Sequence, residues 1–98
     1  MAKTLPKEIQ AHRREILEIA GRHGASEVCL FGSASRGDLH AESDYDFLVE
    51  AGSNTSAWFP AGLIQDLESL LGRHVDVVTR QALHPLLRDR IFAEAVSL

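Results

Sequence analysis

The chain has 98 residues, enough for one core, and we expect residues 1–98 to form a single domain. Its 45% hydrophobic and 24% charged residues are ordinary for a globular protein, which excludes a low-complexity or disordered chain. A net charge of −4 gives no overall attraction for a polyanion, so a nucleic-acid partner is disfavoured. The start of the chain lacks the apolar core of a signal peptide, and no apolar run approaches the about 20 residues of a membrane span. We therefore expect a cytoplasmic protein without a membrane partner.

The first half of the chain predicts one helix followed by two strands. Apolar residues recur at helical spacing from Pro6 to His23, and Gly24 is placed to end this helix in a left-handed cap. Two short apolar runs rich in β-forming residues, 27–32 and 45–50, predict strands. The polar, glycine-containing segment between them predicts a turn that includes at most one turn of helix.

The second half predicts a helix, a strand and a last helix. A loop of small residues over 51–57 is followed by a helix that ends at Gly72, a strand over 73–80, and a helix with Pro85 in its first turn. Leucine and isoleucine mark the apolar face of the first of these helices, and the last helix shares a face among Leu87, Ile91, Phe92 and Ala95. The order α-β-(turn)-β-α-β-α predicts an α/β or α+β domain with a small mixed sheet of three to four strands and flanking helices.

Three side chains with reactive or aromatic groups have an ordinary packing explanation. Cys29 lies inside an apolar run and is predicted to pack as a small hydrophobic residue. Trp58 and Phe59 precede Pro60 at the entry to a helix, where we expect them to pack in the core or at its edge. A partner-facing or base-stacking role for the two aromatic residues is the alternative.

Three aspartates are the candidate metal ligands. Asp44 and Asp46 are two residues apart on a predicted strand, so both carboxylates leave the same face and can hold divalent cations jointly. Asp76 lies among valines in a later strand, and it would complete a triad if the two strands were neighbours. The alternative is that Asp76 simply occupies the solvent face of a half-buried strand. Because paired carboxylates repel each other, a cation is the economical explanation.

A segment just ahead of the aspartates could hold a phosphate. Gly32 follows a strand and lets the backbone approach a phosphate closely, and the Ser33 hydroxyl can donate to its oxygens. Arg36 adds charged donors and Gly37 adds freedom to turn. Mg²⁺ is usually held by carboxylates together with substrate phosphates, so the acids predict a nucleotide or another phosphate ligand. The alternative for the same segment is a surface turn.

The five histidines show no close ligand spacing of the zinc type. We expect them to be surface or capping residues, with only His40 and His74 near the acids.

The combined pattern resembles a known family. It consists of Gly32-Ser33, Arg36-Gly37, Asp44-x-Asp46 on a strand and Asp76 on a later strand, and it resembles the active-site signature of the polymerase-β-like nucleotidyltransferases. The short length and the form of the stretch from about Glu27 to Val96 resemble the minimal nucleotidyltransferase (MNT) antitoxins.

This resemblance implies a small mixed sheet that binds Mg²⁺, with two ions, and ATP as substrate. It implies that Gly32 and Ser33 hold the triphosphate, that Asp44 and Asp46 hold the two metals, and that Asp76 shares a metal and helps to activate the attacking hydroxyl. It also implies a HEPN ribonuclease toxin as partner, which receives AMP on a tyrosine and is thereby silenced. Because all three carboxylates are present, an active enzyme is favoured. The alternatives are a non-catalytic antitoxin that acts by binding alone and a stand-alone nucleotidyltransferase that modifies RNA or a small molecule.

Overall fold

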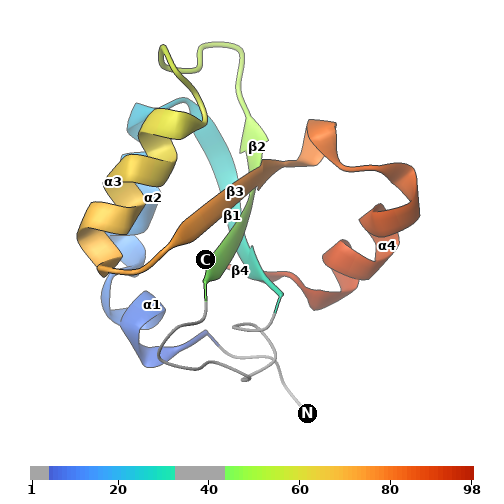
Figure 1. Ribbon diagram of the computed structural model, residues 1–98, viewed down its shortest axis with the longest axis horizontal. Helices are drawn as coiled ribbons and strands as arrows, with labels where there is room; N and C mark the ends of the chain where they lie inside the picture. The colour runs from blue at the N-terminus through green and yellow to red at the C-terminus, as the bar shows by residue number, and fades with distance from the viewer. Residues whose placement is uncertain (1–4, 33–43) are drawn as a thin grey trace.

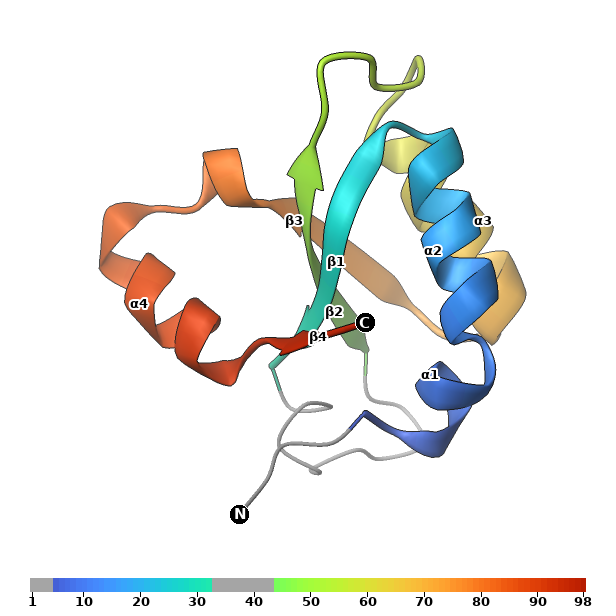
Figure 2. The ribbon, with the colours of Figure 1, turned by 180° about the vertical axis from the view of Figure 1, so that it is seen from behind.

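The computed structural model describes residues 5–32 and 44–98 and shows a four-stranded sheet with helices on both sides (Figures 1 and 2). The predicted fold class is confirmed. In chain order the elements are α1 (Lys7–Ala11), α2 (Arg13–Arg22), β1 (Ala25–Phe31), β2 (Tyr45–Ala51), α3 (Ala61–Leu71), β3 (Val75–Thr79), the 3₁₀ helix η2 (Arg80–Ala82), α4 (Pro85–Glu94) and β4 (Val96–Ser97). None of the helices in these described ranges is long and apolar enough to cross a membrane.

The strand order of the sheet is β3-β2-β1-β4. β1 pairs antiparallel with β2 and with β4, whereas β2 and β3 run parallel. A parallel neighbour needs a crossover, and α3 supplies it. This topology makes β2 and β3 adjacent, which is the condition that the sequence argument set for Asp76 to join Asp44 and Asp46.

The main core lies between the sheet and helices α1, α2 and α3, which Figure 1 shows together on one side of the strands. Alternate residues of β2 point into it, and Tyr45, Phe47 and Val49 are all fully buried. From the helices, Ile16 and Leu67 are buried against the same face. Burial of these side chains is the dominant stabilising term for a domain of this size.

The opposite face of the sheet carries a smaller apolar cluster. Cys29, Leu48 and Leu83 are buried there, and Cys29 packs as a small hydrophobic residue, as predicted. Ile91 and Ala95, at the C-terminal end of α4, pack against this cluster. The active-site candidates on β2 and β3 share this face, because Asp46 is two residues from Leu48 on one strand.

Two of the helices predicted from the sequence differ from those in the structure. The helix predicted over 6–23 is interrupted at His12, whose φ of −106° and ψ of 11° separate α1 from α2. Ile9 before the break and Ile16 after it are both fully buried, so the break lets both segments reach one core. In α4 the predicted apolar face is only partly covered, since Ile91 and Ala95 pack against the small cluster while Leu87 is 50% and Phe92 39% exposed.

Smaller differences concern a strand and an aromatic residue. The pair Val96–Ser97 forms the edge strand β4, which the sequence did not predict. Trp58 is 85% exposed, so the expectation of core or edge packing is wrong for this residue. Its neighbour Phe59 does pack against the main core. The two predicted glycine caps are confirmed, with φ of +84° at Gly24 and +64° at Gly72.

Candidate active site

Parallel pairing of β2 and β3 places the acidic residues side by side. Asp46 lies directly opposite Asp76 in the strand register. A hydrogen bond of 3.0 Å from the Tyr45 amide to the His74 carbonyl continues the ladder to the entrance of both strands. Asp44 and His74 directly precede β2 and β3. Because side chains two apart in an extended chain share a face, Asp44 lies on the side of Asp46 and His74 on the side of Asp76. We call these four residues the β2–β3 array.

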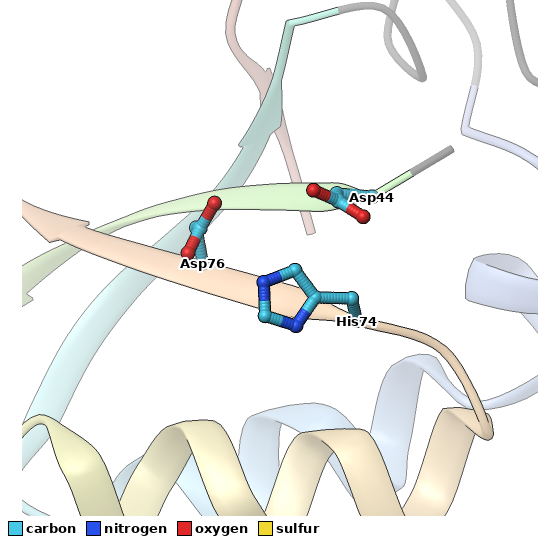
Figure 3. Close-up of side chains that lie close together, drawn as sticks. All are labelled: Asp44, His74 and Asp76. Atoms are coloured by element: carbon cyan, nitrogen blue, oxygen red, sulfur yellow. The ribbon is translucent and has the colours of Figure 1, made fainter. Parts of the chain in front are cut away.

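Three members of the array come together tightly. One ligand atom each from Asp44, His74 and Asp76 lies within 4.8 Å of the other two. In Figure 3 the imidazole ring lies between the two carboxylates, with one ring nitrogen turned toward Asp76. Asp46 is not part of this three-residue group, and its carboxylate is directed toward another neighbour.

That neighbour is Gly32, at the end of β1. Its φ of +78° is in the left-handed region, and a Cβ added there would lie 2.6 Å from Asp46 Oδ2. The conformation therefore favours glycine, and any side chain here would displace the Asp46 carboxylate. Gly32 is predicted from the sequence to let the backbone approach a phosphate, and in the structure this residue also leaves room for the Asp46 carboxylate.

The array concentrates negative charge. The pKa of the Asp46 carboxyl is raised above its usual value, first by burial and then by the carboxylates of Asp76 and Asp44, while His74 opposes the shift. Strands β2 and β3, both within the described part of the chain, contain no lysine or arginine, so the strands themselves supply no countercharge to these carboxylates. A divalent cation would satisfy this charge.

The histidine is held from outside the array. Glu68 Oε2, on the last turn of α3, lies 2.8 Å from His74 Nδ1 and accepts a 3.0 Å hydrogen bond from the Val75 amide. The pKa of Glu68 is lowered mainly by the Val75 amide, and the pKa of His74 is raised mainly by its hydrogen bond to Glu68. One carboxylate thus fixes both the start of β3 and the orientation of the imidazole.

The structure brings Gly32, Asp44, Asp46 and Asp76 to one end of the sheet, as the sequence argument required. The other predicted phosphate ligands lie outside the described residues, namely Ser33, Arg36, Gly37 and the nearby His40.

His74 lies near the acids, as predicted from the sequence, although it was expected to be only a surface or capping residue. The alternation that paired Asp44 with Asp46 also puts His74 on the face of Asp76, so the signal was available. The role of Glu68 had no such signal, since it depends on how α3 turns into β3.

The donor set fits a divalent cation. Carboxylate oxygens are the preferred ligands of Mg²⁺ and Mn²⁺, and imidazole nitrogen suits first-row transition metals. His74 and Asp76 are solvent-exposed, so a cation and a substrate can reach them.

Residues 11–98 match the family described as nucleotidyltransferase domain. The chain belongs to this family. The predicted resemblance to minimal nucleotidyltransferases is confirmed, and the chain is a nucleotidyltransferase enzyme.

Two curated archaeal relatives carry the matching activity in their names. A Methanocaldococcus jannaschii protein, MJ0435, provisionally named a protein adenylyltransferase, is 42% identical over 88% of this chain and 92% of its own length. The protein adenylyltransferase MntA of Thermococcus cleftensis is 34% identical over 90% of this chain and 86% of its own.

Solved structures agree with the family. A structure provisionally described as a minimal nucleotidyltransferase superposes with a TM-score of 0.85 and 36% identity, covering all of both chains. A crystal structure of a toxin–antitoxin complex, MntA–HpeT, contains a chain that matches with a TM-score of 0.73 and 26% identity. That match covers 88% of this chain and 70% of the other.

Proposed function

We propose that this nucleotidyltransferase is an antitoxin that transfers AMP from ATP to a tyrosine hydroxyl of a cognate HEPN ribonuclease toxin and thereby silences it. The β2–β3 array carries the proposal, because three carboxylates gathered at the entrance of two neighbouring strands are suited to a divalent cation with a triphosphate. The names of the archaeal relatives support a protein acceptor, and the toxin–antitoxin complex among the similar structures supports a toxin partner.

The reaction would form a bond between the acceptor oxygen and the α-phosphorus of ATP and break the bond to the leaving pyrophosphate. Bound Mg²⁺, with two ions expected, would supply charge stabilisation for the attacking and leaving oxygens. Asp44, Asp46 and Asp76 would hold the cations. Asp76 is exposed, so an incoming hydroxyl can reach it and give up its proton there.

The triphosphate would lie along the segment that follows β1. Gly32, which has a left-handed backbone, has no side chain to occupy the space beside the Asp46 carboxylate. On the strength of the sequence motif, Ser33, Arg36 and Gly37 remain in the proposal as triphosphate ligands. Positioning by these groups, rather than covalent chemistry by the protein, would provide most of the rate enhancement.

The acceptor would arrive on the partner protein. Helix α4 lies on the same side of the sheet as the array (Figure 2), and it exposes three large apolar side chains, Leu86, Leu87 and Phe92. Leu86 is 85% and its neighbour Leu87 50% exposed, and grouped exposed apolar residues are typical of interaction surfaces. We expect this surface to contact the toxin and bring its tyrosine to the array.

The test is the intact mass of the toxin, the product of the adjacent gene, after co-expression with this protein. Increments of whole AMP units on a tyrosine are expected with the wild type and should vanish with Asp44→Asn or Asp46→Asn. Circular dichroism of both variants checks that they fold. Unchanged transfer by either folded variant would refute the assigned site, and AMP on RNA without any partner would refute the protein acceptor.

A second candidate is neutralisation by binding alone, which the exposed apolar residues of α4 favour. In that case the folded Asp44→Asn variant would still protect cells, and the toxin would keep its unmodified mass. Leu86→Lys separates binding from chemistry, because it should weaken co-purification of the toxin without touching the array. Leu17→Lys is the matched control, since Leu17 is 39% exposed on α2, on the opposite side of the sheet.

A further inference from the structure

We propose that His74, oriented by Glu68, is a nitrogen ligand of the cation at the β2–β3 array, and that it shifts the metal preference of this site from Mg²⁺ toward Mn²⁺ and later first-row transition metals. The inference rests on the proposed function, because it concerns the cation that the array would hold.

The position of His74 supports ligation. Its imidazole has an atom within 4.8 Å of ligand atoms of both Asp44 and Asp76, so one ion between the three residues can reach all of them. The peptide bond that follows His74 is fixed, because the His74 carbonyl accepts from the Tyr45 amide and the Val75 amide donates to Glu68. The backbone from which the imidazole side chain extends therefore has a fixed position at the edge of the array.

The orientation of the ring supports it further. Since the Glu68 carboxylate lies 2.8 Å from Nδ1, the hydrogen of a neutral imidazole belongs on Nδ1, and the lone pair belongs on Nε2. In Figure 3 the nitrogen turned toward Asp76 is the one remote from the side-chain stem, which is Nε2. A carboxylate that accepts from one imidazole nitrogen while the other binds metal is a common arrangement around protein-bound cations.

A nitrogen donor changes which ion is preferred. Mg²⁺ takes oxygen ligands and retains several waters, so an imidazole adds little to its affinity. Affinity for nitrogen-containing sites increases from Mn²⁺ to Co²⁺. Loss of His74 should therefore weaken binding least for Mg²⁺, more for Mn²⁺ and most for Co²⁺.

The experiment measures binding of each metal alone to the full chain by isothermal titration, for the wild type, His74→Gln and His12→Gln. His12 is the matched control, because it is a partly exposed histidine whose Nδ1 also faces a glutamate, Glu15, at 3.2 Å. For His74→Gln we expect a loss of about tenfold or more for Co²⁺, the scale seen when metal sites lose a supporting residue. The loss for Mg²⁺ should be the smallest of the three.

A spectroscopic measurement shows the ligand directly. Spin-echo modulation from ¹⁴N is expected in the Mn²⁺-loaded wild type and in His12→Gln, and it should disappear in His74→Gln. Glu68→Ala should weaken the modulation, because it leaves the ring without its orienting partner. Absence of ¹⁴N modulation in the wild type, or an equal loss of affinity for all three metals, would overturn the inference.

These outcomes are separable from the proposed function. If Asp44→Asn abolishes AMP transfer while His74→Gln leaves metal binding unchanged, the function stands and the nitrogen ligand is wrong. If the losses of affinity in His74→Gln follow the expected order of the three metals but no AMP is transferred, His74 is a metal ligand and the proposed function is wrong.

Discussion

Substitution of Gly32 by alanine should damage the active site more than the fold. The backbone there has a φ of +78°, which costs a residue with a side chain roughly 1–2 kcal/mol. For a domain of this size, each 1 kcal/mol lowers the melting temperature by about 4–8 °C. A decrease of roughly 4–16 °C is therefore expected from the conformation alone.

The added methyl group also meets Asp46. The added Cβ would lie 2.6 Å from Asp46 Oδ2, whereas an ordinary van der Waals contact begins at about 3.4 Å, so the carboxylate has to move. A displacement of this size in a catalytic group can reduce the rate on the order of 10²-fold. We expect AMP transfer by Gly32→Ala to fall by about that factor.

Gly72→Ala is the matched control. Its φ of +64° gives the same conformational cost, and an added Cβ would meet nothing within 4 Å. Thermal melts followed by circular dichroism should show similar losses for the two variants, and a transfer assay should show a large loss for Gly32→Ala only. If both variants melt alike and transfer AMP equally, the reasoning from the Gly32–Asp46 contact is refuted.

Three further substitutions separate stability from activity. Tyr45→Phe removes the 3.2 Å hydrogen bond from the buried hydroxyl to Glu8, so denaturant unfolding should show a loss of about 1 kcal/mol with transfer retained. Gly21→Ala lies in α2 with open space around its Cβ, and melts should show a gain of about 0.5–1 kcal/mol. Asp46→Asn should raise the metal-free melting temperature at pH 7 and abolish transfer. Because folding raises the pKa of Asp46, the ionised carboxylate destabilises the folded wild type at pH values above that pKa. In a pH series, the gap in melting temperature between Asp46→Asn and the wild type should therefore close as the pH falls toward the pKa that Asp46 has in the unfolded chain. A gap that stays constant over this series would contradict the assigned cause.

The sequence predicted which acidic residues lie together better than it predicted the edges of the fold. Alternation along β2 was readable because Asp44 and Asp46 interrupt an apolar run whose other members face the core. The neighbouring position of Asp76 depended on strand order, which a single sequence leaves open, and the parallel register decided it. The orientation of His74 by Glu68 could not be read, since it needs the geometry of the turn between α3 and β3.

Errors at the periphery have a common physical cause. Periodicity identifies an apolar face, but it does not say whether the fold has a surface to cover that face. In α4, Leu87 and Phe92 share the predicted face and remain largely exposed, because only the end of the helix reaches the small cluster. A similar limit applies to Trp58, whose size favours burial while its φ of +66° belongs to a loop that turns it outward.

The register that builds the core also builds the active site. Along β2, Tyr45 and Phe47 point into the core while Asp44 and Asp46 point to the other face. A slip of one residue would bury both carboxylates and expose both rings, which costs the apolar burial and leaves buried charges without partners. The aromatic residues therefore fix the strand position that the carboxylates need, and the energy of the core opposes any register in which Asp76 would lose its neighbours. For this reason substitutions in the β2–β3 array should alter metal binding and AMP transfer while the fold persists.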